Sequence, residues 1–340
     1  MPGTKLTGVT GVDFDTALSR SVGGSMDLDS ALSLFYGASR RDRALQLFRA
    51  ASEIRDQNLG KKLTLTAHVH MITSCELSTP CLYCSLSSSY PAVTNERSKL
   101  TPRELVRAVR YAMNRGAQSI VLVGGTDLAG SDSLIRDVVQ KVREVTEMDL
   151  ALDVGPSLSV ETVKWLKGEN VSTIYCSIET VNRGVFARAK PSDSLDTRIG
   201  FMEMLQREGV KLGNVVMNGL GSTADLLESI LYSRRFRNMS HLYISSFHPV
   251  RGTPWASRHP ASVRGSLKAL AIARLVFPKA HLGLAEVEVE DPGSAARTSS
   301  QLLAGGGNSF AGLLMYKEKR IDNVEQISRE ASLLGFEAEK

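Results

Sequence analysis

Short apolar runs alternate with amphipathic stretches along most of the chain from Leu63 onward. Apolar runs of this length predict buried strands, and apolar residues spaced three and four apart predict helices. We expect eight strands, over Leu63–Ile72, Ser119–Val123, Leu150–Val154, Thr173–Ile178, Lys211–Met217, His241–Ser245, His281–Leu284 and Leu302–Ala304. Strands that alternate with helices are typical of parallel β–α units.

The stretches between these strands have helical periodicity, and several follow a Ser, Thr or Asp that can cap a helix, as at Thr101, Ser131, Ser262 and Asp291. We expect helices over Pro102–Arg115, Asp132–Thr146, Val160–Lys167, Asp196–Glu208, Thr223–Arg234, Val263–Phe277 and Pro292–Gln301, and a closing amphipathic helix over Ile321–Leu334. Eight such units predict a (β/α)8 TIM barrel with its active site at the C-terminal ends of the strands. An open sheet with fewer units is the alternative.

The N-terminal part divides into a polar segment and a helical one. Ser30–Asn58 has apolar residues at helical spacing and predicts two helices, the second ending near Gly60. Residues 1–27 are rich in Gly, Ser and Thr. We therefore expect a flexible segment over residues 1–28 and one domain over 29–340, consisting of an N-terminal helical extension, the barrel and the closing helix.

Composition excludes several classes of protein. The 340 residues are 42% hydrophobic and 23% charged, which is ordinary for a globular protein. Lys and Arg number 41 against 36 Asp and Glu, and they are scattered rather than gathered on one stripe, so we expect no nucleic-acid partner. Neither a signal peptide nor a membrane-length apolar stretch is recognisable, which predicts a cytoplasmic protein without a membrane partner.

Three of the four cysteines, Cys75, Cys81 and Cys84, lie within ten residues after the first predicted strand. This clustering indicates metal ligation rather than disulfides. Three thiolates can hold an iron–sulfur cubane and leave one iron open for another ligand. A zinc site is an alternative, with His68 or His70 as the fourth ligand. The third possibility is that the cysteines are inert and buried.

The cysteine loop, with Tyr83 just before its last cysteine, resembles that of the radical S-adenosylmethionine superfamily, although the usual spacing there is three and then two residues rather than five and then two. Gly124-Gly125-Thr126-Asp127 resembles the glycine-containing turn of that superfamily. The resemblance implies a 4Fe-4S cluster that reductively cleaves S-adenosylmethionine to methionine and a 5′-deoxyadenosyl radical. It also implies that the backbone of the turn receives the methionine amino group.

The segment from Ser177 to Arg198 resembles the region after strand four in biotin synthase, the di-iron hydrogenase maturase and methylornithine synthase. The resemblance implies that Glu179 contacts the methionine moiety, that Arg198 pairs with its carboxylate and that Asp153 hydrogen-bonds the ribose. A guanidinium forks onto a carboxylate, so the role of Arg198 is chemically reasonable. Alternatively, Arg198 pairs with Glu203 or with another helix charge.

The only other cysteine is Cys176, most simply a buried strand residue. Biotin synthase needs further cysteines for a second cluster, which argues against that activity. The five-then-two spacing resembles the radical enzyme that takes part in assembling the iron–guanylylpyridinol cofactor of mono-iron hydrogenase. A methylornithine synthase-like lysine mutase is the alternative, with Asp153 and Arg251 as substrate contacts. Either implies a small-molecule substrate and an electron donor such as ferredoxin or flavodoxin.

The barrel lumen is where substrate would meet the radical. Met217, Asn218 and His248 follow predicted strands and are candidate lumen residues. Each could equally fill the barrel core, because inward-facing side chains of such barrels form a packed interior.

Overall fold

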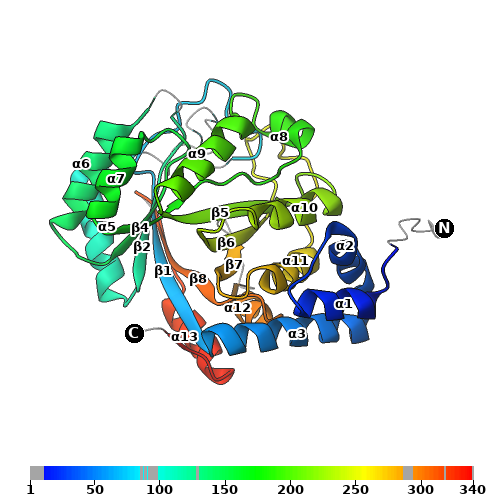
Figure 1. Ribbon diagram of the computed structural model, residues 1–340. Coiled ribbons are helices and arrows are strands. Elements are labelled where there is room, and N and C mark those ends of the chain that lie inside the picture. The colour runs from blue at the N-terminus through cyan, green and yellow to red at the C-terminus, as the bar shows by residue number, and fades with distance from the viewer. Residues whose placement is uncertain are drawn as a thin grey trace.

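Eight parallel strands curl around a common axis at the centre of the computed structural model (Figure 1). The structure describes residues 11–84, 87, 90, 99–127, 130–285, 294–317 and 319–338. The strands are β1 (Lys62–His70), β2 (Ser119–Val123), β3 (Asp149–Asp153), β4 (Val171–Tyr175), β5 (Lys211–Asn218), β6 (Met239–Ser246), β7 (His281–Ala285) and β8 (Ser309–Met315). Their order is β7-β6-β5-β4-β3-β2-β1-β8, which confirms the predicted barrel-like α/β fold.

The two ends of this sheet, β7 and β8, meet without forming a ladder. The Asn308 N–H donates to the Leu282 carbonyl at 2.9 Å. A Cβ on Gly283 would lie 2.2 Å from the Ser309 carbonyl oxygen, so only glycine allows this approach of the two backbones. Two short strands extend the sheet: β9 (Arg320–Asp322) pairs antiparallel with β8, and β10 (Glu337–Ala338) pairs parallel with β1.

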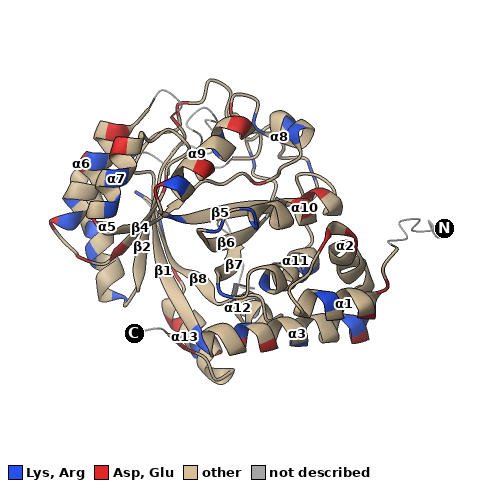
Figure 2. Cartoon of the chain, viewed as in Figure 1, with Lys and Arg blue, Asp and Glu red and all other residues tan. Residues whose placement is uncertain are grey.

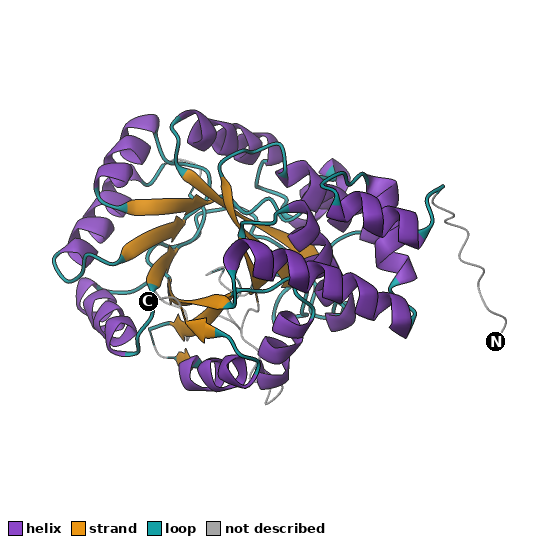
Figure 3. Cartoon of the chain, turned by 60° about the horizontal axis from the view of Figure 1, so that its bottom comes forward, coloured by secondary structure: helices purple, strands orange, loops and turns teal. Residues whose placement is uncertain are grey.

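Helices surround the strands on the outside of the curled sheet (Figure 3). They are α5 (Pro102–Asn114), α6 (Asp132–Arg143), α7 (Val160–Gly168), α8 (Arg183–Ala189), α9 (Leu195–Arg207), α10 (Thr223–Ser233), α11 (Val263–Val276), α12 (Ser294–Leu303) and α13 (Val324–Leu333). Buried Leu, Ile and Val side chains between strands and helices form the main core. The predicted cap at Thr101 is a capping box with Glu104, whereas Ser131 precedes α6 without a side-chain cap.

The eighth strand was predicted at the wrong place. Leu302 belongs to α12, and the strand begins after Gly305-Gly306-Gly307, at Ser309. The closing helix is also shorter than predicted, because Arg320–Asp322 pairs with β8 before α13 begins at Val324. The predicted cap Asp291 lies outside the described residues, and helix α8 was not predicted.

Three helices precede β1: α1 (Phe14–Val22), α2 (Leu28–Gly37) and α3 (Arg41–Leu59). The two helices predicted over Ser30–Asn58 are present. Part of the segment expected to be flexible, residues 1–28, is helical: Asp13 caps α1, and Phe14 is 2% exposed against α2. Residues 1–10 lie outside the described part. All three helices lie beside α11 (Figure 1).

Basic and acidic residues are interspersed over the outer helices (Figure 2). Among the described helices, none combines the length and the apolar character needed to cross a membrane.

Candidate active site

The cysteine loop lies at the C-terminal rim of the sheet, as predicted. It begins directly after β1 with Met71, whose φ of 64° turns the chain out of the strand. Its backbone is then tied to two neighbouring loops: the Glu76 N–H donates to the Thr126 carbonyl, and the Leu82 N–H donates to the Ala189 carbonyl, both at 2.9 Å. The loop that carries the thiols is therefore positioned by the segment after β2 and by the last residue of α8.

Cys75, Cys81 and Cys84 are half-buried cysteines. Burial raises the pKa of the Cys81 thiol, and the nearby positive charge of Lys190 opposes that rise. A buried thiolate requires a cation, and the irons of a cubane would supply one to each of the three thiolates. The donor set therefore fits a 4Fe-4S cluster with one iron left open.

The histidines that the zinc alternative requires have other contacts. The His70 ring stacks on Tyr316 with centroids 4.4 Å apart, and His68 Nε2 lies 3.1 Å from Thr66 Oγ1. Within the described ranges, no group of three or more His, Cys, Asp or Glu is arranged to hold a single metal ion.

The glycine turn lies directly beneath the cysteine loop. The Gly124 N–H donates to the Asp153 carbonyl at 2.8 Å, and the Gly125 N–H donates to the Thr73 carbonyl at 3.1 Å. A Cβ on Gly125 would lie 2.2 Å from the Cys75 backbone nitrogen. Only glycine therefore lets the cysteine loop pack on this turn, a structural reason for Gly125 that sequence reasoning did not provide.

Glu179 occupies a strained position in the segment that follows β4. Its φ is 61°, in the left-handed region that non-glycine residues rarely adopt. The conformation is held by backbone bonds to β5, because the Glu179 N–H donates to Val215 and the Glu179 carbonyl accepts from Met217. Strained backbone of this kind is concentrated at functional sites. The Glu179 carboxylate accepts a hydrogen bond from the Tyr83 hydroxyl.

Arg198 is paired within the protein. Its side chain is 4% exposed, its Nη2 lies 2.6 Å from Asp193 Oδ2, and its Nη1 donates to the Ser177 carbonyl at 3.0 Å. Nη2 also donates to Thr126 Oγ1 at 3.2 Å. The alternative partner suggested from the sequence, Glu203, instead contacts Arg235 at 3.3 Å. The contact of Arg198 with a cofactor carboxylate stays a prediction.

Sequence reasoning missed Lys190 and Asp193, which link the predicted residues. The buried Lys190 Nζ lies 3.2 Å from Glu179 Oε2 and 3.4 Å from Asp193 Oδ2. Burial alone would raise the pKa of Asp193, but Arg198 and Lys190 outweigh it and hold that pKa below its usual range. Both residues stand in the segment between Glu179 and Arg198, yet nothing in their spacing shows that they are buried.

A cavity of about 510 Å³ opens beside these residues inside the barrel. It is lined by Tyr83, Cys84, Asp153 and Glu179 together with His68, His70, Met217, His248, Arg251 and Tyr316. Burial raises the pKa of Asp153, against the opposing effect of Arg198 and Lys190. Asn218 does not line this cavity and donates to Ser266 Oγ at 2.9 Å. The structure thus brings Tyr83, Asp153 and Glu179 to one lumen, whereas Gly124, Gly125, Thr126 and Arg198 do not line it.

Cys176 is fully buried directly after β4, and its Sγ lies 3.4 Å from the Arg198 carbonyl oxygen. The predicted burial of this residue is confirmed, but Cys176 lies one residue beyond the strand in which it was expected.

Comparison with known proteins agrees with this arrangement. Residues 69–231 match the model of the Radical SAM superfamily. An uncharacterised protein of Methanocaldococcus jannaschii is 29% identical over 75% of this chain and 68% of its own length. The [FeFe] hydrogenase maturase subunit HydE of Thermotoga maritima is 28% identical over 69% of this chain and 66% of its own length.

Among solved structures, methylornithine synthase has the same fold, with a TM-score of 0.81 at 18% identity over 95% of this chain and 97% of that one. A cysteine-bearing loop at the C-terminal rim of a parallel α/β barrel lies where such folds carry their active sites, and its thiols are of the kind that hold iron–sulfur clusters. Residues 69–231 are thus similar to the Radical SAM superfamily, and the protein is an enzyme with a 4Fe-4S cluster and S-adenosylmethionine as cofactors. Enzymes of this superfamily act on small-molecule substrates.

Proposed function

We propose that this radical enzyme takes part in assembling the iron–guanylylpyridinol cofactor of mono-iron hydrogenase. The observation that carries the proposal is the five-then-two spacing of Cys75, Cys81 and Cys84, which is unusual in the superfamily. The fourth and last cysteine of the chain, Cys176, is buried away from the lumen, so the sulfur insertion of biotin synthase has no evident cysteine donor set. Similarity to a hydrogenase maturase subunit also supports a role in hydrogenase cofactor assembly.

The residues of the site have distinct roles in this proposal. Cys75, Cys81 and Cys84 hold three irons of the cluster. When bound, the cluster and S-adenosylmethionine supply a 5′-deoxyadenosyl radical that removes a hydrogen atom from the substrate. Glu179 receives the methionine ammonium, and Tyr83 and Lys190 keep its carboxylate in place.

The other predicted contacts complete the cradle. Gly124, Gly125 and Thr126 provide backbone oxygens for the amino group, Asp153 binds the ribose, and Arg198 offers its remaining Nη1 N–H to the methionine carboxylate. Enclosure of the lumen by the cysteine loop keeps water and stray hydrogen donors from the radical. The electron comes from a donor such as ferredoxin or flavodoxin.

The test is anaerobic reconstitution with iron and sulfide, followed by reduction in the presence of S-adenosylmethionine. We expect about four irons per chain and 5′-deoxyadenosine formation that rises with pyridinol precursors. Cys75→Ala should lose the cluster, whereas the matched variant Cys176→Ala should keep it. One tightly bound zinc per chain without cleavage of S-adenosylmethionine would overturn the enzyme assignment.

A methylornithine synthase-like lysine mutase is the second candidate. Asp153 and Arg251 line the same lumen, where they could receive the ammonium and carboxylate of lysine. Lysine is therefore assayed in parallel with the pyridinol precursors. Conversion of lysine to methylornithine would replace the first proposal with this one.

A further inference from the structure

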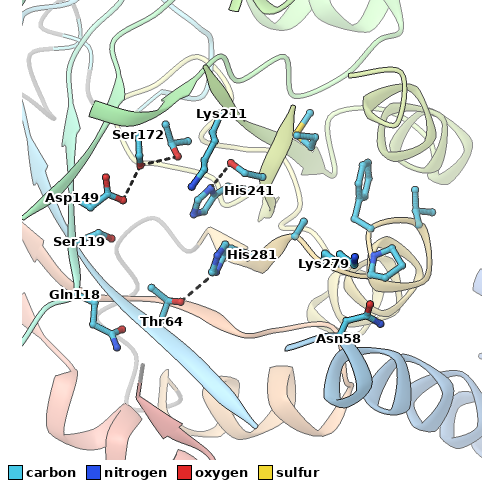
Figure 4. A pocket seen from close by; sticks show the side chains of 17 residues that line it. Asn58, Thr64, Gln118, Ser119, Asp149, Ser172, Lys211, His241, Lys279 and His281 are labelled. Carbon is cyan, nitrogen blue, oxygen red and sulfur yellow. Dashed lines mark hydrogen bonds between the residues drawn. The ribbon is translucent and has the colours of Figure 1, made fainter. Parts of the chain in front are cut away.

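A second cavity, of about 790 Å³, lies at the opposite end of the barrel, where the strands begin (Figure 4). Residues near the start of each strand from β1 to β7 line it, together with Asn58 near the end of α3 and residues 276–280 at and after the end of α11. Its volume falls in the range of small-molecule sites. No part of the proposed cofactor cradle lines it.

Each of the strands β1 to β7 contributes polar residues to this cavity. They include Thr64, Ser119, Asp149, Thr173, Lys211, His241 and His281, whereas Met239 of β6 is an apolar residue of the lining. The interior layers of such barrels are usually filled by bulky branched apolar side chains. These seven polar side chains do not fill the end of the barrel where the strands begin. They give the cavity there hydrogen-bonding groups that a purely structural layer does not need.

An aromatic layer separates this cavity from the lumen. Tyr175 and Tyr243 line the lumen cavity but not the second one, and their ring centroids are 6.1 Å apart. The Tyr243 hydroxyl is 2.7 Å from Ser309 Oγ, and Tyr175 lies 5.8 Å from the His241 ring. A ligand in the second cavity would therefore not contact the radical chemistry.

The charge of the second cavity is positive. Lys211 and Lys279 have no carboxylate within 4.0 Å among the described residues. Among the described residues that line the cavity, Asp149 is the one acidic side chain, and it already accepts a hydrogen bond from Ser172 at 2.7 Å. Figure 4 shows Lys211, His241 and His281 reaching toward the same space.

The two histidines form a flat wall beside Lys211. Their rings stack with centroids 4.7 Å apart, and His241 Nδ1 lies 2.9 Å from Ser240 Oγ. Burial, helped by His281 and Lys211, lowers the pKa of His241 to about 3, so this imidazole is neutral near pH 7. The lysines supply the charge, and neutral imidazoles can supply N–H donors.

We propose that this cavity is a binding site for a small organic anion whose phosphate or carboxylate group pairs with Lys211 and is hydrogen-bonded by His241. Two ammonium groups without carboxylate partners and a lining rich in hydrogen-bond donors match an oxyanion better than a neutral ligand. Because the aromatic layer lies between, the bound anion stabilises the barrel without taking part in the reaction.

Calorimetric titration of the full chain with inorganic phosphate and, separately, with citrate tests the proposal and distinguishes the two anion chemistries. We expect at least one of them to bind and to shift the NMR signals of His241 and His281. Lys211→Met should weaken that binding by about tenfold or more. Lys211→Arg should retain it, and the matched variant Lys141→Met, at an exposed lysine of α6, should leave it unchanged.

Absence of binding by both anions, or equal binding by Lys211→Met, would overturn the site. The measurement needs neither cluster nor S-adenosylmethionine, so its outcome is independent of the proposed function. The variant should fold, because Lys211 is exposed at the start of β5.

Discussion

Lys190 shows how one buried charge connects the candidate site. It is 3% exposed and lies between the carboxylates of Glu179 and Asp193. Glu179, Cys81 and Asp193 together raise its pKa, despite burial and the repulsion of Arg198. Two buried cations therefore balance two buried carboxylates before any cofactor is added, which keeps the cradle formed.

Lys190→Met should lower the free energy of unfolding by about 3–5 kcal/mol, because removing one partner leaves a buried charge uncompensated. Urea unfolding measures the change. The double variant Lys190→Met/Glu179→Gln should recover part of the loss, since the unpaired carboxylate is then absent. Lys141→Met, which breaks an exposed pair with Glu144, should cost less than about 1 kcal/mol. Equal stability of Lys190→Met and the parent would contradict this account.

Arg198 has a related consequence for experiments on cofactor binding. Its guanidinium already holds Asp193, so Arg198→Ala disturbs the network as well as any contact with S-adenosylmethionine. Loss of binding in that variant alone would not identify a direct contact. Arg198→Lys, which keeps the charge but not the forked geometry, is the better comparison.

At the level of elements, β5 depends on the absence of a side chain at Gly213. A Cβ there would lie 2.3–2.6 Å from atoms of the Tyr175 ring on the neighbouring strand β4. Tyr175 belongs to the aromatic layer inside the barrel. The small residue on one strand therefore makes room for the large one on the next.

Gly213→Ala should cost about 1–3 kcal/mol of unfolding free energy, the usual cost of overpacking. In the double variant Gly213→Ala/Tyr175→Val the ring is replaced by a smaller side chain, which should relieve the clash. The changes in unfolding free energy caused by the two substitutions should therefore be non-additive in a double-mutant cycle. Gly200→Ala in α9 is the control. No atom lies within 4 Å of its added Cβ, so it should stabilise by about 0.5–1 kcal/mol. Additive effects at Gly213 and Tyr175 would refute the packing argument.

At the scale of the whole molecule, buried histidines should make stability depend on pH. Burial lowers the pKa of His68 to about 4, and burial with its neighbours lowers that of His241 to about 3. In the unfolded chain both titrate near their ordinary value of 6.5. Below about pH 6.5 the two imidazoles are protonated in the unfolded chain but stay neutral in the folded protein. Stability is therefore complete above about pH 6.5 and falls as the pH drops toward 4.

The slope should be at most about 1.4 kcal/mol per pH unit for each histidine. Urea unfolding of the iron-free chain in phosphate-free buffer between about pH 7 and pH 5 measures it. His68→Gln should flatten the slope by one histidine's share. An unchanged slope in His68→Gln would show that His68 does not carry this effect.

Local patterns determined most of the architecture. Apolar runs and helical periodicity located strands β1 to β7 within one to three residues, and the cysteine loop was placed at the correct rim. These features depend on residues that are close together in the sequence. The spacing of their apolar residues indicates which face of each strand or helix is buried. The eighth strand was misplaced because Leu302 and the strand that begins at Ser309 are both apolar, and three glycines separate them.

Other features depended on contacts between distant segments. α1 is ordered because Phe14 packs on α2, although its own composition is polar. Arg198 pairs with Asp193 rather than Glu203, Lys190 joins the site, and Gly125 supports the cysteine loop. Motif and periodicity therefore predicted the fold and singled out the three cysteines, while the roles of the cradle residues stay predictions. Which charged side chains pair with each other, and which polar residues line the second cavity, followed only from the tertiary structure. The physical reason is that burial brings these groups together and requires buried charges to be compensated.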